Sequence, residues 1–186
     1  MHRLARFLPV YLFISVVIFA FFPMEKVYST EKGEIGFLSD APLEHIEARS
    51  KQLRGLVQLD TRRFAFSVAI GTFEGFNSAL QREHFNENYL ESQKYPQATF
   101  SGKLLDEISV NKTGKQTIRV KGQFTVHGVS KERTIEVQVE HTKNKLDIVA
   151  AFQVPLADHA IEIPRLVTQK IAESIQVTVH AQLEEK

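Results

Sequence analysis

The stretch TIRVKGQFTVH, residues 117–127, decides the fold class of this chain. Ile118, Val120, Phe124 and Val126 share one parity, whereas every residue of the other parity is polar. A period of two is typical of a β-strand that buries one of its faces. The stretch therefore predicts a half-buried strand.

The same alternation continues along the rest of the chain. Ile135, Val137 and Val139 resume it after residues 128–131, which predicts a hairpin with its turn in that tetrapeptide. Further runs predict strands at residues 46–59, 64–70, 98–104, 146–154 and 175–181, and a short strand at residues 35–38. About eight even strands joined by short turns favour a closed barrel or a sandwich.

One of these strands changes parity within its length. Ile46 and Ala48 occupy even positions, but Leu53 and Val57 occupy odd ones. A β-bulge near residues 50–52 would keep both sets on the same face of the sheet.

One segment departs from the alternation. The sequence SALQ at residues 78–81 has the form of a capping box and predicts a helix that runs to about Leu90. Phe85 and Tyr89 lie four residues apart and would share one face of that helix. A second helical turn is expected near residues 165–172.

The charged residues indicate which side of the barrel is apolar. Arg119, Lys121, Glu136 and Glu140 all have the parity opposite to that of the apolar set. If the apolar set faced outward, as in outer-membrane barrels, these charges would be packed into a narrow lumen at a prohibitive cost. The apolar set is therefore expected to face inward. An eight-stranded barrel of this kind is either filled by side chains or holds one small ligand.

Composition and motifs exclude several other classes of function. The chain has 186 residues, a formal net charge of +1 and no cysteine. Nucleic acid is therefore not an expected partner, and disulfides, thiol catalysis and cysteine-based metal sites are excluded. The histidines lack the spacing of a metal site, and the sequence contains no nucleophile elbow, phosphate loop or dinucleotide motif. We therefore expect no metal, no cofactor and no catalytic residue.

The N-terminus has the form of a secretion signal. Basic residues within positions 2–6 precede an apolar run of 15 residues at positions 8–22, which is short for a membrane-spanning helix of about 20 residues. Because VYS at residues 27–29 ends in a small residue, we expect a signal peptide at residues 1–29 and a mature domain at residues 30–186. The alternative is an uncleaved N-terminal anchor. In both cases the domain is expected outside the cytoplasm, in the periplasm or secreted.

Several motifs resemble those of a known family. The sequence GQFTVHGVSK, residues 122–131, resembles the G-x-L-T-[IV]-H-G-V-[ST]-K hairpin of the YceI-like lipid-binding proteins. REHF at residues 82–85 and YPQATF at residues 95–100 resemble that family's helix with its H-[LF] pair and its YP-x-x-TF strand start. The resemblance covers residues 35–183 and implies an all-β fold, namely an extended, lipocalin-like, eight-stranded antiparallel barrel with one inserted short helix. It also implies export to the periplasm and a polyisoprenoid or other long-chain amphiphile held in the lumen.

Two departures from the family pattern concern the ends of the domain. The family's usual opening is not recognisable at residues 32–43, and DHAIEIP at residues 158–164 replaces its Gly-rich region. These changes predict a shortened first strand and a shallower pocket.

The inward parity supplies a set of candidate ligand-binding residues, offered only as a set because each residue alone fits an ordinary core position. The set consists of Phe64, Phe66, Val68, Phe100, Ile118, Val120, Phe124, Val126, Val137, Val139, Ile148, Phe152 and Val177. His84, Phe85 and Tyr89 form a candidate lid, although the same helix could simply plug one end of the barrel.

The leading hypothesis is an exported carrier or scavenger of a lipid-like molecule, with the oligomeric state left open. The alternative is a ligand-free structural or interaction barrel of the cell envelope. An enzyme acting on a hydrophobic substrate ranks third, because the parity places few polar groups inside the barrel. His141, at a strand end, is the main exception. His127, beside Gly128, is expected to stabilise a turn by hydrogen bonding.

Overall fold

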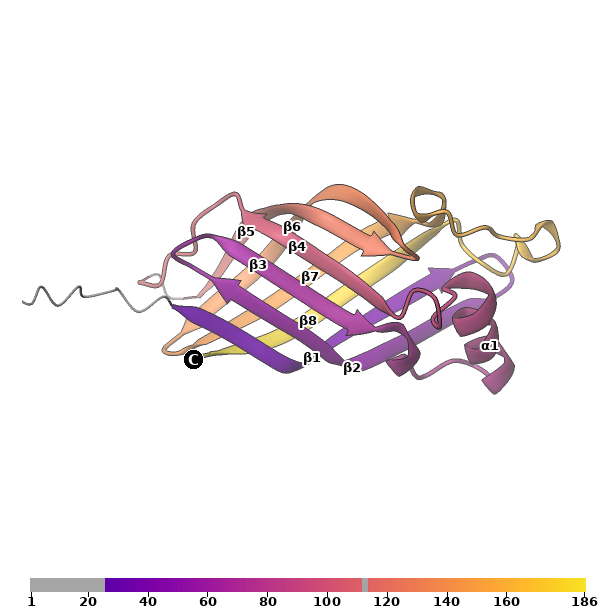
Figure 1. Ribbon diagram of the computed structural model, residues 1–186, viewed down its shortest axis with the longest axis horizontal. Coiled ribbons are helices and arrows are strands. Elements are labelled where there is room, and N and C mark those ends of the chain that lie inside the picture. Colours follow the sequence, from indigo (N-terminus) through magenta and orange to yellow (C-terminus); the bar gives the residue numbers. More distant parts are fainter. Residues whose placement is uncertain (1–25, 112–113) are drawn as a thin grey trace, which may run out of the picture.

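The strands of the computed structural model, which describes residues 26–111 and 114–186, pair in chain order, and β8 closes the barrel against β1. The strands are β1 (Val27–Asp40), β2 (His45–Gln58), β3 (Arg63–Ala69), β4 (Gln97–Leu104), β5 (Lys115–Val126), β6 (Val129–Thr142), β7 (Lys145–Pro155) and β8 (Ser174–Glu185). They run obliquely along the long axis of the molecule (Figure 1). This arrangement confirms the predicted eight-stranded antiparallel barrel with one inserted short helix.

Alternation along the strands separates an apolar interior from a charged exterior. In β5, Ile118 and Val120 are buried, whereas Arg119 and Lys121 are exposed. On the outer surface, Lys121 Nζ lies 2.8 Å from a Glu132 carboxylate oxygen on the neighbouring strand. The inward orientation of the apolar set is therefore confirmed.

β1 differs from the prediction. It spans 14 residues, Val27–Asp40, where the sequence predicts a short strand at residues 35–38. The strand begins within the segment assigned to the signal peptide, residues 1–29, and Tyr28 is fully buried. The rest of the predicted signal, up to residue 25, lies outside the described residues. The prediction of a shortened first strand is wrong.

Two bulges explain why the alternation does not reveal β1. Thr30 pairs with Gly55, Gly33 pairs with Leu53, and Ile35 pairs with Ser50. One extra residue therefore lies in β1 between the first two pairs, and one extra residue lies in β2 between the last two. The bulge on β2 confirms the predicted parity change near residues 50–52. The bulge on β1 shifts the parity of that strand as well, and this hides its first half from a period-two pattern.

β5 and β6 are joined by the two-residue turn His127-Gly128 and not by the predicted tetrapeptide at residues 128–131. Both turn residues have a positive φ, 51° and 72°, as a type I′ turn requires. Val129 already belongs to the β6 ladder. A Cβ on Gly128 would collide with the ring of Tyr95, so close packing and backbone conformation both favour glycine here.

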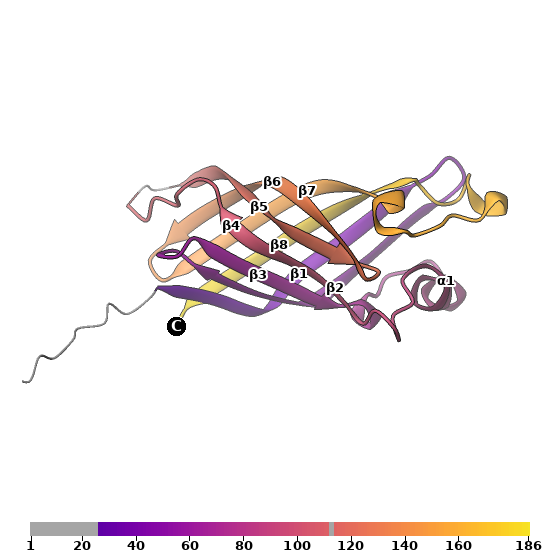
Figure 2. The same ribbon diagram turned by 45° about the horizontal axis from the view of Figure 1, so that its top comes forward.

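The inserted helix begins where the capping box predicts. The Ser78 hydroxyl accepts a hydrogen bond from the Gln81 backbone N–H at 3.1 Å, and α1 follows at Ala79–His84. A π-helical turn, η2 (Phe85–Tyr89), extends the helix to the predicted end. The helix lies at one end of the barrel (Figures 1 and 2).

Three short 3₁₀ turns complete the described structure: η1 (Ile70–Thr72), η3 (Leu156–His159) and η4 (Arg165–Val167). The helical turn predicted near residues 165–172 is thus limited to η4. Among the described helices, none combines the length and apolar character needed to cross a membrane.

Candidate ligand-binding cavities

The barrel interior contains two adjoining cavities. The inner cavity has a volume of about 90 Å³, and the outer cavity, next to α1, has a volume of about 430 Å³. Ile35, Val68, Ala98 and Phe124 line both cavities, and we call these four residues the neck. One extended ligand can occupy both cavities only by passing the neck.

Every residue of the predicted lumen set lines one of these cavities. The inner cavity is lined by Phe64, Phe66, Val68, Phe100, Ile118, Val120, Phe124, Val137, Val139, Ile148 and Phe152. Val126 and Val177 line the outer cavity. Among the described residues that line the inner cavity, only Ser67 and Thr99 carry polar side chains. The inner cavity therefore offers an apolar tail almost nothing but apolar contacts.

The end of the barrel opposite α1 is closed by an aromatic pair, the fully buried Tyr28 and the half-buried His141. The Tyr28 hydroxyl lies 3.1 Å from His141 Nε2, and the two rings meet edge to face. Leu146 and Leu183, also fully buried, pair across β7 and β8 at this end. Burial raises the pKa of the Tyr28 phenol, which keeps it protonated. His141, the main polar group that the sequence places inside the barrel, thus has a structural partner.

Aromatic rings cover the outer cavity. The Phe85 ring centroid lies 5.2 Å from that of Phe37, 5.0 Å from that of Phe76 and 5.8 Å from that of Phe73. We call these four residues the aromatic lid. Sequence reasoning missed three of them, because Phe73 and Phe76 lie in a loop and Phe37 lies in the strand whose alternation is broken.

The predicted lid residues all line the outer cavity. Phe85 belongs to the aromatic lid, and Tyr89 and His84 line the cavity beside it. Burial raises the pKa of the Tyr89 phenol, so it stays neutral. The helix therefore covers the outer cavity without filling it.

The mouth of the outer cavity is framed by three segments that are hydrogen-bonded to one another. Gln81 on α1 donates to the Glu44 carboxylate at 2.6 Å, and the Leu43 backbone N–H donates to the segment after η4 at 2.9 Å. These segments carry three exposed leucines: Leu43 (66%), Leu80 (58%) and Leu166 (97%). The mouth therefore has an apolar rim.

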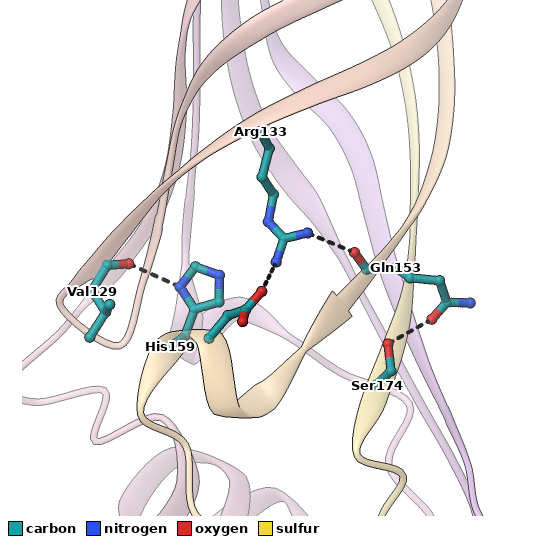
Figure 3. A network of polar contacts seen from close by, with 6 residues as sticks. Val129, Arg133, Gln153, His159 and Ser174 are labelled. Atoms are coloured by element: carbon teal, nitrogen blue, oxygen red, sulfur yellow. Dashed lines mark hydrogen bonds and ion pairs between the residues drawn. The ribbon is translucent and has the colours of Figure 1, made fainter.

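A polar cluster lies in the barrel wall near the same end. Arg133 on β6 donates to the Gln153 carbonyl oxygen at 3.1 Å and to the Asp158 carboxylate at 2.9 Å (Figure 3). Because Asp158 pairs with Arg133, it does not orient His159 as a catalytic triad would require.

His159 is fully buried within this cluster. Its Nδ1–H donates to the Val129 carbonyl oxygen at 2.9 Å, and its ring meets that of Phe124 edge to face. Burial lowers the pKa of the imidazole, so the ring is neutral at pH 7. His127 Nδ1–H donates to the His159 carbonyl oxygen at 3.1 Å, and this confirms its expected role as a hydrogen bonder at the turn.

Within the described ranges, no group of three histidine or carboxylate side chains is arranged to hold a metal ion.

Solved structures with a similar fold come from several bacteria. A polyisoprenoid-binding domain from Saccharophagus degradans, implicated in plant cell wall breakdown, has a TM-score of 0.73 and 12% identity, over 88% of this chain and 100% of that one. BcnA from Burkholderia cenocepacia has a TM-score of 0.68 and 15% identity, over 82% of this chain and 96% of that one. The YceI protein of Campylobacter jejuni has a TM-score of 0.56 and 15% identity, over 100% of this chain and 94% of that one. At these identities the similarity concerns the fold alone.

A comparison of this sequence with proteins of curated function found no match. The family model described as the YceI-like domain matches residues 28–183, which are most of the chain. The match begins at the buried Tyr28 and includes all eight strands, wholly or nearly so. The chain therefore belongs to the YceI-like family, as the motifs of its β5–β6 hairpin and inserted helix predict.

Proposed function

We propose that this protein carries or scavenges a polyisoprenoid or another long-chain amphiphile outside the cytoplasm. The observation that supports this most directly is the pair of apolar cavities joined at the neck. Each methylene group buried there contributes about 0.8 kcal/mol. A tail of several isoprene units would therefore give micromolar affinity or better after the costs of binding are subtracted.

The similar structures agree with this proposal. The domain from Saccharophagus degradans is described as polyisoprenoid binding. Its similarity to this chain extends over the whole of that domain, so the same barrel architecture is available to hold a comparable ligand.

Binding fits the interior better than catalysis does. Among the described residues, Ser67 and Thr99 are the only polar ones that line the inner cavity, and Asp158 is paired with Arg133 in the barrel wall. Titratable residues, namely Glu44, His84 and Lys170, are found in the lining of the outer cavity, where Glu44 is hydrogen-bonded to Gln81. General acid–base chemistry needs a titratable group within reach of the substrate. We infer that the inner cavity retains an apolar tail and does not transform it.

Export follows from the N-terminal signal, for which we propose an earlier cleavage point. Cleavage after Ser29 would remove Tyr28, which is fully buried and hydrogen-bonded to His141. We infer that the signal ends before Val27, the first residue of β1. The mature protein would then keep a complete barrel in the periplasm or outside the cell.

The proposal is tested by purifying the protein from its own cell envelope without detergent and recording its native mass. We expect a bound lipid, which solvent extraction releases and mass spectrometry identifies. After extraction, the protein should bind geranylgeraniol and cis-parinaric acid saturably. Protein that carries no lipid and binds neither probe would contradict the proposal.

The exposed leucines of the mouth favour a second candidate, an interaction barrel that docks on another envelope protein. Leu43 and Leu166 present apolar surface to solvent and belong to the lining of neither cavity. This candidate predicts lipid-free protein and a captured partner that is lost in the Leu43→Ser/Leu166→Ser variant. Leu56→Ser, which changes a less exposed leucine on β2, is the matched control.

A further inference from the structure

The barrel wall is incomplete between β6 and β7. The β5–β6 ladder continues to the turn at Val129, and the β7–β8 ladder continues to Pro155. The β6–β7 ladder, in contrast, ends at Val137 and Ala150. In the described part of the chain, no ladder pair joins residues 129–136 to residues 151–155. We call this part of the wall the seam.

Side chains replace the missing ladder at the seam. Arg133 reaches from β6 to the Gln153 carbonyl oxygen on β7 and to Asp158 on η3, and His159 on η3 donates to the Val129 carbonyl oxygen on β6 (Figure 3). A sheet edge left without such partners would expose backbone groups that pair with other chains. The contacts of Arg133 and His159 therefore hold β6 against β7 and η3, and we call these two residues the latch.

The latch is less completely hydrogen-bonded than a strand ladder. His159 Nε2 and Arg133 Nε are both buried, and neither has a hydrogen-bond partner among the described residues. A buried polar atom without a partner costs free energy that exposure to water recovers. Opening the seam hydrates both atoms, so it costs less than separating paired strands of equal length.

Both edges of the seam line the ligand cavities. Val154 on β7 and the adjoining Leu156 of η3 line the outer cavity, as do Phe124 and Val126 on β5, the strand next to β6. Ile135 on β6 and Phe152 on β7 line the inner cavity in the same way. The seam is therefore a side wall of both cavities, and its opening would expose them along their length.

We propose that the seam is a side gate through which the ligand enters and leaves, with Arg133 and His159 as its latch. This inference rests on the proposed function, because it concerns access to the same cavities. A long flexible tail that enters end-on has to pass the aromatic lid and then the neck. Lateral insertion bypasses both constrictions, since the tail slides sideways into the open slot.

A cross-link across the seam tests the gate. If the β6–β7 register continued beyond the Val137–Ala150 pair, Thr134 would face Gln153, and both side chains are exposed. The chain has no cysteine, so a Thr134→Cys/Gln153→Cys variant can be joined selectively by a short bismaleimide. We expect the cross-link to slow cis-parinaric acid release at least about tenfold in stopped-flow displacement, relative to the same variant before linking.

A second cross-link provides the control. Gln138 and Val149 are paired in the intact part of the same ladder, so linking Gln138→Cys/Val149→Cys should leave the release rate unchanged. Equal release rates with and without the seam cross-link would overturn the gate.

A latch variant tests the same inference without a cross-link. Asp158→Asn removes the carboxylate that Arg133 binds, and we expect about tenfold faster release of cis-parinaric acid. Glu132→Gln breaks a neighbouring ion pair within the β5–β6 ladder, and it should not change release.

The outcomes separate the two proposals. If the wild-type protein binds neither cis-parinaric acid nor geranylgeraniol, the proposed function fails, and the gate fails with it. If the wild-type protein binds both probes but neither the cross-link nor Asp158→Asn changes release, only the gate is overturned.

Discussion

The Tyr28 hydroxyl lies 3.1 Å from His141 Nε2, and this contact joins residues 113 positions apart in the chain. Tyr28 lies in the part of β1 that precedes its bulge, and His141 lies near the end of β6. The pair lies at the end of the barrel opposite the aromatic lid, where the fully buried Leu146 and Leu183 pack as well.

A chain that begins at Thr30 should be much less stable than a chain that begins at Val27. Loss of the buried Tyr28 leaves a hole at the closed end, and removal of a buried aromatic side chain costs about 3–5 kcal/mol. Urea unfolding of the two chains measures the difference. Equal stabilities, or a native N-terminus after Ser29, would contradict the assignment of residues 27–29 to the mature domain.

Tyr28→Phe separates the hydrogen bond from the packing of the ring. We expect a loss of about 1 kcal/mol in the free energy of unfolding, because the ring remains but His141 loses its partner. Tyr95→Phe is a suitable comparison, since Tyr95 lies at the other end of the barrel, against His127. A smaller loss in Tyr28→Phe than in Tyr95→Phe would show that the hydroxyl contributes little.

The neck should select ligands by tail length. Ala98→Phe narrows the passage, so geranylgeraniol should bind at least about tenfold more weakly, because its tail no longer reaches the inner cavity. Geraniol, which is short enough for the outer cavity, should bind unchanged. Ala65→Phe, on the exposed face of β3, is the matched control. If Ala98→Phe weakened the binding of geraniol and geranylgeraniol equally, the longer tail would not extend from the outer cavity into the inner one.

The aromatic lid should hold the ligand in the outer cavity. Phe85→Ala removes the ring that contacts Phe37, Phe73 and Phe76, so the affinity for cis-parinaric acid should fall by about tenfold. Glu83→Ala changes an exposed residue of the same helix that is outside the lining of the outer cavity, so it should bind normally. Fluorescence titration measures both variants, and an unchanged affinity in Phe85→Ala would assign the helix a purely structural role.

His159 should make stability depend on pH below neutrality. Burial lowers the pKa of its imidazole in the folded state, with Arg133 and Lys131 acting in the same direction and the Val129 carbonyl and Asp158 opposing them. Below about pH 6.5 the unfolded chain binds a proton that the folded chain does not, so stability falls as the pH falls. The slope from this residue is at most about 1.4 kcal/mol per pH unit.

The His159→Asn variant isolates this contribution. Asparagine keeps a donor for the Val129 carbonyl oxygen but does not titrate. Urea unfolding between pH 8 and pH 5 should therefore show a shallower loss of stability in the variant than in the wild type. Parallel pH profiles would show that His159 is not the residue responsible.

Much of the architecture follows from local patterns in the sequence. The alternation at residues 117–127 predicts both the strand and the inward direction of Phe124, because a charged lumen is too costly. The capping box at residues 78–81 places the start of the helix, since the hydroxyl and the backbone N–H that it satisfies are neighbours in the chain.

The tertiary structure alone decides the features that control access to the lumen. The bulge on β1 hides Tyr28 from any period-two pattern, and the aromatic lid assembles rings from a strand, a loop and a helix. The seam arises where the β6–β7 ladder ends and Arg133 turns toward Gln153. The sequence by itself thus determined an apolar container, because side-chain parity is a local property of each strand. Its closed end, neck and side wall depend on contacts between distant residues, and only the folded chain brings these together.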